Sequence, residues 1–231
     1  DLSDVEYLMR NKKNTMTLLE GDGDFRSPEC VELLKEADIV VTNPPFSLFR
    51  DYVALLMQYN KQFAIIGNQN AITYREIFPL IKSNKIWLGY NNGHYWFMVP
   101  DSYEEKKTDF KIDESGQKWR RMGNICWFTN LDIEKRHEDM TLFRTYSPDI
   151  YPKYDNYDAI EVSKTADIPC DYDGYMGVPI TFMQYYNPEQ FEIAGLDDHR
   201  VEWVGHGPRL NGKVKYRRVI IRRKQVNINE N

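Results

Sequence analysis

The strongest constraint on the fold is a repeated order of short apolar run, turn-forming loop and amphipathic segment. The run TMTLL at 15–19 is followed by the loop GDGDF and then by Ser27 and Pro28, which are typical of a helix start. The apolar run DIVVT at 38–42 precedes the loop NPPFS and the periodic segment LFRDYVALLMQY, and QFAIIG at 62–67 is a third run. Short strands that alternate with helices predict an α/β protein, with strands of the buried parallel type.

The pattern changes after the third run. We expect a helix at 72–84 that Pro79 kinks or shortens, followed by strands at 86–89 and 94–99 and a further strand in GNICWFTNL. With no long helical segment between these late strands, we expect them to be antiparallel at one edge. The prediction is therefore a mainly parallel sheet with an antiparallel edge.

The C-terminal part has a different composition. Helical periodicity fades from about Thr145, and tyrosines, prolines and Asp-rich turns become frequent. We therefore expect a catalytic domain over 1–145 and a loop-rich region with short strands over 146–231. In RLNGKVKY, Asn211 and Gly212 are typical of a hairpin turn between two strands.

Charge is distributed unevenly along the chain. The net charge is −5, yet residues 207–231 contain eight basic residues and one acidic residue. Such a segment can bind phosphates, although a solvated strand pair explains it equally well. The candidate DNA-binding residues are Arg209, Lys213, Lys215, Arg217, Arg218, Arg222 and Arg223. The loop 106–121 is also rich in basic residues, but its interleaved acidic residues suit a solvated loop equally well.

Several classes of protein are excluded by simple patterns. No stretch approaches about 18 apolar residues, and the first residues have no apolar signal core, so we expect an intracellular, cytoplasmic protein without a membrane span. Cys30, Cys126 and Cys170 have no CxxC spacing and do not cluster with the four histidines. We therefore expect reduced, buried thiols and no metal site.

The loop NPPF at 43–46 is the motif that carries chemistry. An exocyclic amine of a base is a poor nucleophile because its lone pair is delocalised into the ring. The side-chain oxygen of Asn43 and the carbonyl of Pro44 can each accept one N–H bond and so favour a tetrahedral nitrogen. Pro45 stiffens the loop, and Phe46 offers a face on which a base can stack. The alternative is a stiff turn with Phe46 in the core.

At these residues the chain resembles the S-adenosylmethionine-dependent amino-methyltransferases, and specifically the EcoRI-type adenine-specific DNA methyltransferases. The likeness extends over GDGDFRS, ADIVVTNPPFSLFRDYV, FAIIGNQNAITYREIF, NKIWLG, DYDGYMGVPITF and YNPEQFEI. It implies a Rossmann-like sheet and N6-methylation of a flipped adenine held by Asn43 and Pro44 and stacked on Phe46. It also implies that Asp24 and Phe25, with Asn43, contact the cofactor S-adenosylmethionine.

One departure from the family pattern stands out. The Gly-rich cofactor loop and the ribose-binding acidic residue that precede GDGDF in the family have no match here. We therefore expect a chain that lacks its N-terminal cofactor segment and binds S-adenosylmethionine weakly by itself.

The expected partner is double-stranded DNA, from which the adenine must be flipped while phosphate contacts hold the duplex. The expected role is site-specific adenine methylation in restriction-modification, by a monomer, since each strand is methylated separately. An RNA amino-methyltransferase and a non-catalytic nucleic-acid-binding fragment are the alternatives. The Tyr-rich stretch 146–186 suits target recognition or core packing.

Overall fold

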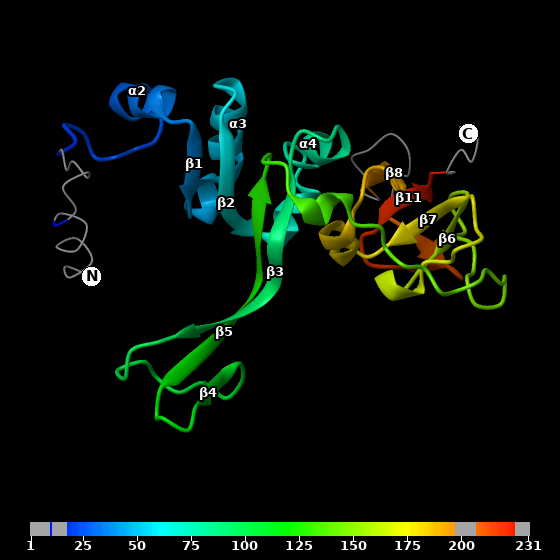
Figure 1. Cartoon of the computed structure of the whole chain (residues 1–231). Coiled ribbons are helices and arrows are strands. Elements are labelled where there is room, and N and C mark those ends of the chain that lie inside the picture. Colours follow the sequence, from blue (N-terminus) through cyan, green and yellow to red (C-terminus); the bar gives the residue numbers. More distant parts are fainter. Residues whose placement is uncertain (1–9, 11–17, 197–206, 225–231) are drawn as a thin grey trace.

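The computed structural model describes residue 10 and residues 18–196 and 207–224. Figure 1 shows two β-sheets, helices α2 and α3 beside the first sheet, and a long arm that projects away from both sheets. Most of the strand expected at 15–19 lies outside the described residues, and Leu18 and Leu19 belong to no strand. Among the described residues, no helix combines the length and the apolar character that crossing a membrane requires.

The first expected helix forms where its capping residues place it. Helix α2 spans Pro28–Glu36, and the hydroxyl of Ser27 accepts a hydrogen bond from the backbone N–H of Cys30 at 3.2 Å. This bond satisfies one of the N–H groups that a helix leaves unpaired at its start, and Pro28 needs no such partner. Strand β1, Ile39–Thr42, follows directly.

Strands β1 and β2 form the parallel pair that the repeated units predict. Strand β1 is followed by the short 3-10 helix Phe46–Leu48, helix α3 at Phe49–Gln58 and strand β2 at Gln62–Asn68. The two strands are paired in parallel, so their carboxyl ends lie at the same edge of the sheet. This strand–helix–strand unit positions the loop NPPF.

Strand β1 is not buried, contrary to the expectation for its apolar run. Ile39 is 48% exposed and Val41 is 66% exposed. The physical reason is that, in the described part of the chain, β1 pairs with β2 on one side and has no strand on its other side. The strand is present as predicted, but its burial was wrongly predicted.

The helix expected at 72–84 is replaced by two shorter elements. A 3-10 helix covers Gln69–Thr73, and the α-helix α4 covers only Phe78–Lys82. Proline has no N–H to donate within a helix and is tolerated in the first turn, where Pro79 lies. Pro79 therefore sets the start of α4 and shortens the helix.

The prediction of a mainly parallel sheet is wrong for the described residues. The first sheet has the order β1-β2-β5-β3, with β4 paired to β5, and every pairing except β1 with β2 is antiparallel. Strands β3 (Trp87–Met98), β4 (Phe110–Ile112) and β5 (Lys118–Thr129) are joined without an intervening helix. A chain that returns without a helical crossover pairs antiparallel with the strand it leaves. The predicted antiparallel edge is confirmed.

The outer halves of β3 and β5 form the projecting arm together with β4 (Figure 1). The ammonium group of Lys111 lies 4.6 Å from the ring centroid of Trp96, and Arg121 forms a 3.0 Å ion pair with Asp109. These local contacts hold the arm together. Lys111 and Arg121, two basic residues of the loop 106–121, therefore contact other side chains of the arm.

The second sheet comes from the C-terminal region. Its order is β6 (Ala159–Glu161), β7 (Tyr175–Val178), β11 (Val219–Arg223) and β8 (Phe191–Leu196), with 3-10 helices at Thr165–Asp167 and Ile180–Tyr185 between strands. Short strands in a loop-rich region are what the sequence predicts for residues 146–231. Buried apolar residues of both sheets belong to one continuous cluster. The domain boundary near residue 145 stays a prediction.

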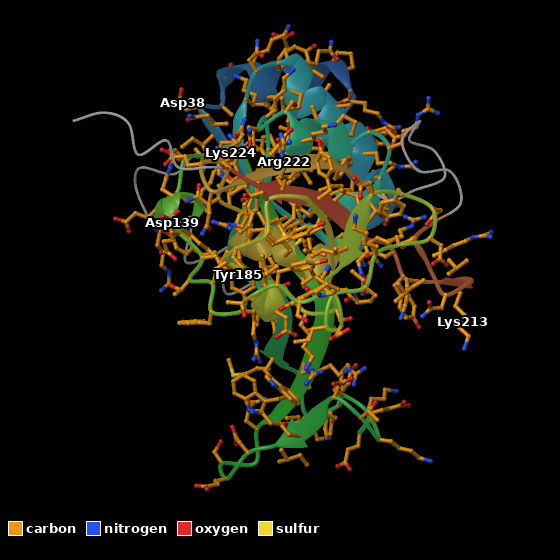
Figure 2. All side chains as sticks on the ribbon, turned by 90° about the vertical axis from the view of Figure 1, so that its right-hand side faces the viewer. Asp38, Asp139, Tyr185, Lys213, Arg222 and Lys224 are labelled. Atoms are coloured by element: carbon orange, nitrogen blue, oxygen red, sulfur yellow. The ribbon has the colours of Figure 1, made fainter. Side chains whose placement is uncertain are left out.

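The predicted hairpin is confirmed. Strands β9 (Arg209–Leu210) and β10 (Lys213–Val214) are joined by Asn211 and Gly212, whose φ angles are 52° and 73°. Positive φ at both positions is the requirement of the tight hairpin turn that Asn-Gly favours. The carboxylate of Asp155 accepts hydrogen bonds from both turn N–H groups, at 3.2 and 2.7 Å. Figure 2 shows Lys213 projecting at the side of the molecule.

The cysteines are free thiols, as predicted, but the predicted burial is correct only for Cys126. Cys126 lies on β5 and is fully buried, and burial raises its pKa to about 12. Cys30 and Cys170 are partly exposed.

A buried charged cluster lies between β6 and the start of β11. The guanidinium of Arg218 donates from Nη2 to Oε1 of Glu161 at 2.6 Å and from Nε to Oε2 at 3.2 Å. The hydroxyl of Tyr154 donates to the same carboxylate, and that of Ser163 donates to it at 3.2 Å. The side chains of Arg218 and Glu161 are only 11% and 4% exposed. A two-pronged, buried pair of this kind fixes the geometry of the groups it joins.

We expect the substitution Glu161→Gln to lower the free energy of unfolding by about 3 kcal/mol, because it leaves a buried guanidinium without its charge partner. Urea unfolding measures this loss. The control is Glu192→Gln, which breaks a half-exposed pair with Arg222 and should cost less than about 1 kcal/mol. Equal losses in the two variants would contradict the prediction.

The loss should depend on pH in a defined direction. Burial alone would raise the pKa of Glu161, but hydrogen bonds from Arg218 and Tyr154 lower it below its ordinary value of 4.5. A carboxylate with a lowered folded-state pKa stabilises the fold above its unfolded-state pKa and loses that contribution as the pH falls. The difference between wild type and Glu161→Gln should therefore shrink below about pH 4.5. Unfolding curves at several pH values measure it.

Candidate functional site

The loop NPPF presents an aromatic ring to solvent rather than to the core. Asn43 and Pro45 are exposed, Pro44 is buried, and Phe46 is 41% exposed. The core position is taken three residues later by Phe49, which is 1% exposed and lies 4.9 Å from the ring of Phe128. The alternative of a turn with Phe46 in the core is therefore not what the structure has.

Phe46 lines a groove with a volume of about 1120 Å³. The groove is formed by three segments that are far apart in the sequence: the loop after β1, the loop after β2, and the C-terminal region around the 3-10 helix Ile180–Tyr185 and the start of β11. Its lining residues are Phe46, Ser47, Arg50, Asn70, Thr73, Tyr74, Arg75, Glu76, Pro179, Ile180, Tyr216, Arg217 and Arg218. This volume leaves room beside Phe46 for a planar base.

The two loops that follow the parallel strands meet at this groove, as the sheet rule predicts. Asn70 comes from the loop after β2, and its backbone N–H donates to the side chain of Asn68 at 2.9 Å. Arg50, at the start of α3, lies 3.8 Å from the carboxylate of Glu76 and stacks over Tyr74 at 5.7 Å. These contacts connect the segment after NPPF to the segment after β2.

The loop GDGDF lies against the first turn of α3. The ring of Phe25 meets that of Tyr52 edge-on at 4.9 Å, and Arg26 lies 3.9 Å from Asp51. Since α3 begins directly after the loop containing Phe46, GDGDF is near the same edge of the sheet. Asp24 and Phe25 are partly exposed, but neither lines the groove at Phe46.

The carboxylate of Asp24 is ionised, and most of its acceptor positions are occupied by hydrogen bonds from Arg26. It accepts three hydrogen bonds from Arg26: from the backbone N–H at 2.9 Å, Nε at 3.0 Å and Nη2 at 2.8 Å. The side-chain bond from Arg26 lowers the pKa of Asp24 to about 2. A carboxylate has about four acceptor positions, so one remains to accept an N–H bond of a ligand.

The predicted DNA-binding residues fall into three groups. Arg209, Lys213 and Lys215 lie on or next to the β9–β10 hairpin and are exposed. Arg217 lines the groove, where it donates to Oγ1 of Thr73 at 2.9 Å. Arg222 and Arg223 lie on β11 near carboxylates, at 2.8 Å from Glu192 and 4.0 Å from Asp173 respectively.

Arg218 differs from the other basic residues of the segment. Its guanidinium is engaged by Glu161 inside the protein, and it also donates to the carbonyls of Arg217 and Tyr216 at 3.3 and 3.4 Å. The sequence suggests a phosphate contact at this position, whereas the structure has a buried ion pair. A positive run in a sequence does not distinguish the two roles.

Most residues that line the groove were not predicted as site residues, and Tyr216, Arg50 and Thr73 are three of them. Tyr216 is an aromatic residue within the basic run, a pattern common in nucleic-acid-binding surfaces, so a signal was present. Arg50 carries no such signal although it follows Phe46 closely in the sequence, and only the fold brings Thr73 to the groove. In the described part of the chain, no group of three or more His, Cys, Asp or Glu side chains can hold a metal ion.

Comparisons with known proteins place the chain in one family. A family model described as "Adenine-specific methyltransferase EcoRI" matches residues 1–224. The Type II methyltransferase M.EcoRI of Escherichia coli is 51% identical over 214 residues, which cover 89% of this chain and 64% of that relative. The chain thus spans less than two thirds of the length of M.EcoRI.

Two relatives from mycoplasmas are also similar. The Type II methyltransferase M.MgeORF184P of Mycoplasma genitalium is 42% identical over 96% of this chain and 75% of its own length. M.MpnI of Mycoplasma pneumoniae is 41% identical over 90% of this chain and 70% of its own length. No solved structure matches the chain.

The substitution Gly67→Ala should lower the free energy of unfolding by about 1–3 kcal/mol, as overpacked cores do. A Cβ at this position near the end of β2 would lie 2.6 Å from a ring atom of Phe49 and 2.8 Å from one of Phe128. Both rings are fully buried and cannot move away freely. Thermal or urea unfolding measures the loss.

The matched control is Gly195→Ala on β8, where an added Cβ would meet no described atom within 4 Å. This variant should be within about 0.5 kcal/mol of wild type. A Gly67→Ala protein as stable as the Gly195→Ala protein would disprove the close packing of α3 on β2.

Proposed function

This chain belongs to the EcoRI family of adenine-specific methyltransferases, and we propose that it methylates N6 of adenine in double-stranded DNA as the modification enzyme of a restriction-modification pair. The observation that carries the proposal is the groove at Phe46. An exposed aromatic ring in the loop after β1 shares this groove with the basic C-terminal segment. A flipped base and the phosphates beside it need these two features together.

Asn43 and Pro44 are the proposed catalytic acceptors. The adenine amine donates one N–H to the side-chain oxygen of Asn43 and one to the carbonyl of Pro44, which favours a tetrahedral nitrogen with its lone pair available. Pro45 limits the motion of the loop, and Phe46 stacks on the base. The exposure of Asn43 and Phe46 supports these roles, because a base can reach both side chains.

The proposed methyl donor is S-adenosylmethionine, which supplies an electrophilic methyl group when bound. Asp24 and Phe25 are proposed to contact its adenine ring, and Asn43 is proposed to contact the donor beside the target amine. The residues fit such a ligand: Asp24 has one acceptor position left for an amine N–H, and Phe25 offers a partly exposed ring.

The basic C-terminal segment is proposed to hold the DNA. Flipping a base costs a few kcal/mol, which phosphate contacts must offset. The exposed hairpin residues Arg209, Lys213 and Lys215, together with Arg217 in the groove, are placed for this role. Arg222 and Arg223 have carboxylate neighbours and contribute less. Because each DNA strand is methylated separately, we propose that the enzyme acts as a monomer.

The substitution Asn43→Ala should lower kcat for N6-methyladenine formation by about 100-fold or more, the usual effect of removing one preorganised hydrogen-bonding group from a transition state. The fold and the affinity for DNA should be unchanged. The measurement uses labelled S-adenosylmethionine and unmethylated duplex DNA, with product detected as N6-methyladenine.

The control for this variant is Gln62→Ala, which removes an exposed amide at the opposite end of β2 and should leave kcat unchanged. An Asn43→Ala protein with wild-type kcat would reject the catalytic role of the loop. A full-length wild-type protein that forms no N6-methyladenine in any duplex, or that prefers RNA, would reject the proposed function.

The double substitution Lys213→Ala with Lys215→Ala should weaken DNA binding and reduce its dependence on salt. Removing one phosphate neutralised by the protein reduces the slope of log K against log salt concentration by about 0.9, so we expect a change of about 1 to 2. Lys35→Ala is the control, because this α2 lysine is paired with Glu32 and lies outside the groove. An unchanged slope in the double variant would remove the hairpin from the DNA interface.

A further inference from the structure

We propose that Tyr216 is a second stacking surface for the flipped adenine and that Arg218 is the residue that positions it. This proposal rests on the proposed function and deepens it, because it assigns the C-terminal region a part in binding the target base. Phe46 and Tyr216 line the same groove although they lie in distant parts of the sequence. A groove with two aromatic side chains suits a flat ring that can contact both.

Exposure is the first observation that supports this role. Tyr216 is 88% exposed and Phe46 is 41% exposed. Large aromatic side chains gain free energy when their faces are covered, and a purine ring covers them well. Both rings are therefore available to a ligand without rearrangement of the core.

The backbone around Tyr216 is held on both sides. The N–H of Lys215 donates to the carbonyl of Pro208 at 2.7 Å. Arg217 donates to the hydroxyl of Thr73 at 2.9 Å, which ties the C-terminal segment to the loop after β2. An exposed ring on an anchored backbone is what a preformed stacking surface requires, since little ordering remains to be done on binding.

Arg218 provides the central anchor. Its Nη1 atom donates to the carbonyl of Tyr216 at 3.4 Å and to that of Arg217 at 3.3 Å, while Nη2 and Nε bind the carboxylate of Glu161. The guanidinium thus connects the backbone of the groove wall to β6 in the second sheet. Lysine at this position has no planar fork and cannot make all of these bonds at once.

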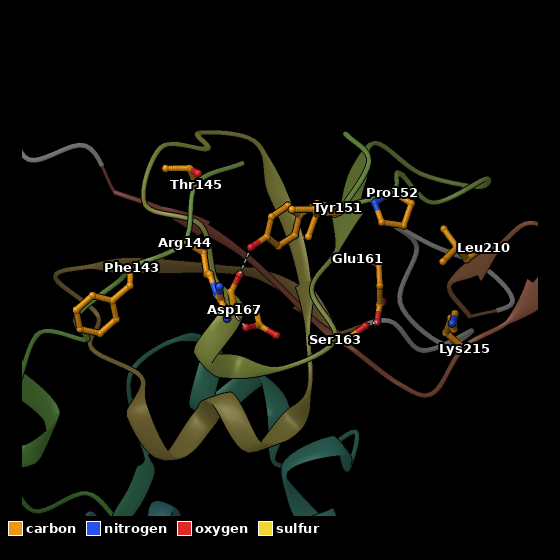
Figure 3. A pocket seen from close by; sticks show the side chains of 11 residues that line it. Phe143, Arg144, Thr145, Tyr151, Pro152, Glu161, Ser163, Asp167, Leu210 and Lys215 are labelled. Carbon is orange, nitrogen blue, oxygen red and sulfur yellow. Dashed lines mark hydrogen bonds and ion pairs between the residues drawn. The ribbon is translucent and has the colours of Figure 1, made fainter. Parts of the chain in front are cut away.

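A second cavity, of about 560 Å³, is lined by Glu161, the ion-pair partner of Arg218. Figure 3 shows Glu161 and Lys215 among the residues that line it, whereas Arg218 and Tyr216 line the groove. Lys215 and Tyr216 are adjacent in the sequence, but Lys215 lines the second cavity and Tyr216 lines the groove. Lys215 cannot replace Tyr216 in the groove, so the aromatic contact depends on one side chain.

The first experiment compares Tyr216→Ala with wild type in methylation of duplex DNA. We expect kcat/KM to fall roughly 10- to 100-fold, in keeping with the effect of removing one aromatic residue that stacks on a base. Tyr216→Phe should keep nearly wild-type activity, because it keeps the ring and removes only the hydroxyl. Tyr185→Ala removes another exposed tyrosine that does not line the groove and should have no effect.

The second experiment uses duplexes in which the target adenine is mispaired, so that flipping costs less. A ring that stacks on the flipped base matters equally in paired and mispaired duplexes, so the loss in Tyr216→Ala should persist. If mispairing restores its activity, Tyr216 acts in opening the base pair and the stacking role is rejected. Wild-type activity of Tyr216→Ala on paired DNA would also overturn it.

The positioning role of Arg218 has its own readout. Arg218→Lys should show the Tyr216→Ala defect in kcat/KM, and adding Tyr216→Ala to it should cause little further loss, because both changes remove the same stacking interaction. Fully additive losses would overturn the positioning role. If full-length wild-type protein is inactive on every duplex, the proposed function is rejected instead, and the stacking role with it.

Discussion

The parallel pairing of β1 with β2 is the constraint on which the rest of the site depends. It brings the loop after β1 and the loop after β2 to the same edge of the sheet, so that Phe46 and Asn70 line one groove. The antiparallel strands then extend the sheet away from this edge and into the arm. This parallel pair supplies the two loops at one sheet edge that ligand sites of α/β sheets use, and the antiparallel strands of the same sheet enlarge it.

Local sequence signals correctly predicted the elements that begin or turn at residues with strong backbone preferences. Ser27 and Pro28 set the start of α2, and Asn211 with Gly212 set the hairpin, since these residues have strong preferences for one backbone geometry. Pro79 correctly indicated a broken helix but not the length of what remained. The exposure of β1 was not predictable, because an apolar run looks the same whether one or both of its edges are paired.

The sequence predicted only the side of the groove that the loop NPPF forms. The motif NPPF identified the loop and the ring that faces the groove, because its residue types are rare and chemically specific. The groove's other wall comes from residues such as Tyr216 and Ile180, which belong to the C-terminal region and reach Phe46 only through the fold. Arg218 shows most clearly what the sequence does not predict. It lies within a basic run, yet it is buried in an ion pair with Glu161, and only the structure distinguishes it from Arg217.

The buried thiol of Cys126 has a consequence for how the protein reacts with its surroundings. Its pKa of about 12 means that almost none of it is the nucleophilic thiolate at neutral pH, and the sheet covers the sulfur. Cys30 and Cys170 are partly open to solvent and are attacked first by alkylating reagents or oxidants. Modification of Cys126 therefore requires β5 to separate from its neighbours. Its reaction with a thiol reagent thus reports whether the first sheet is intact.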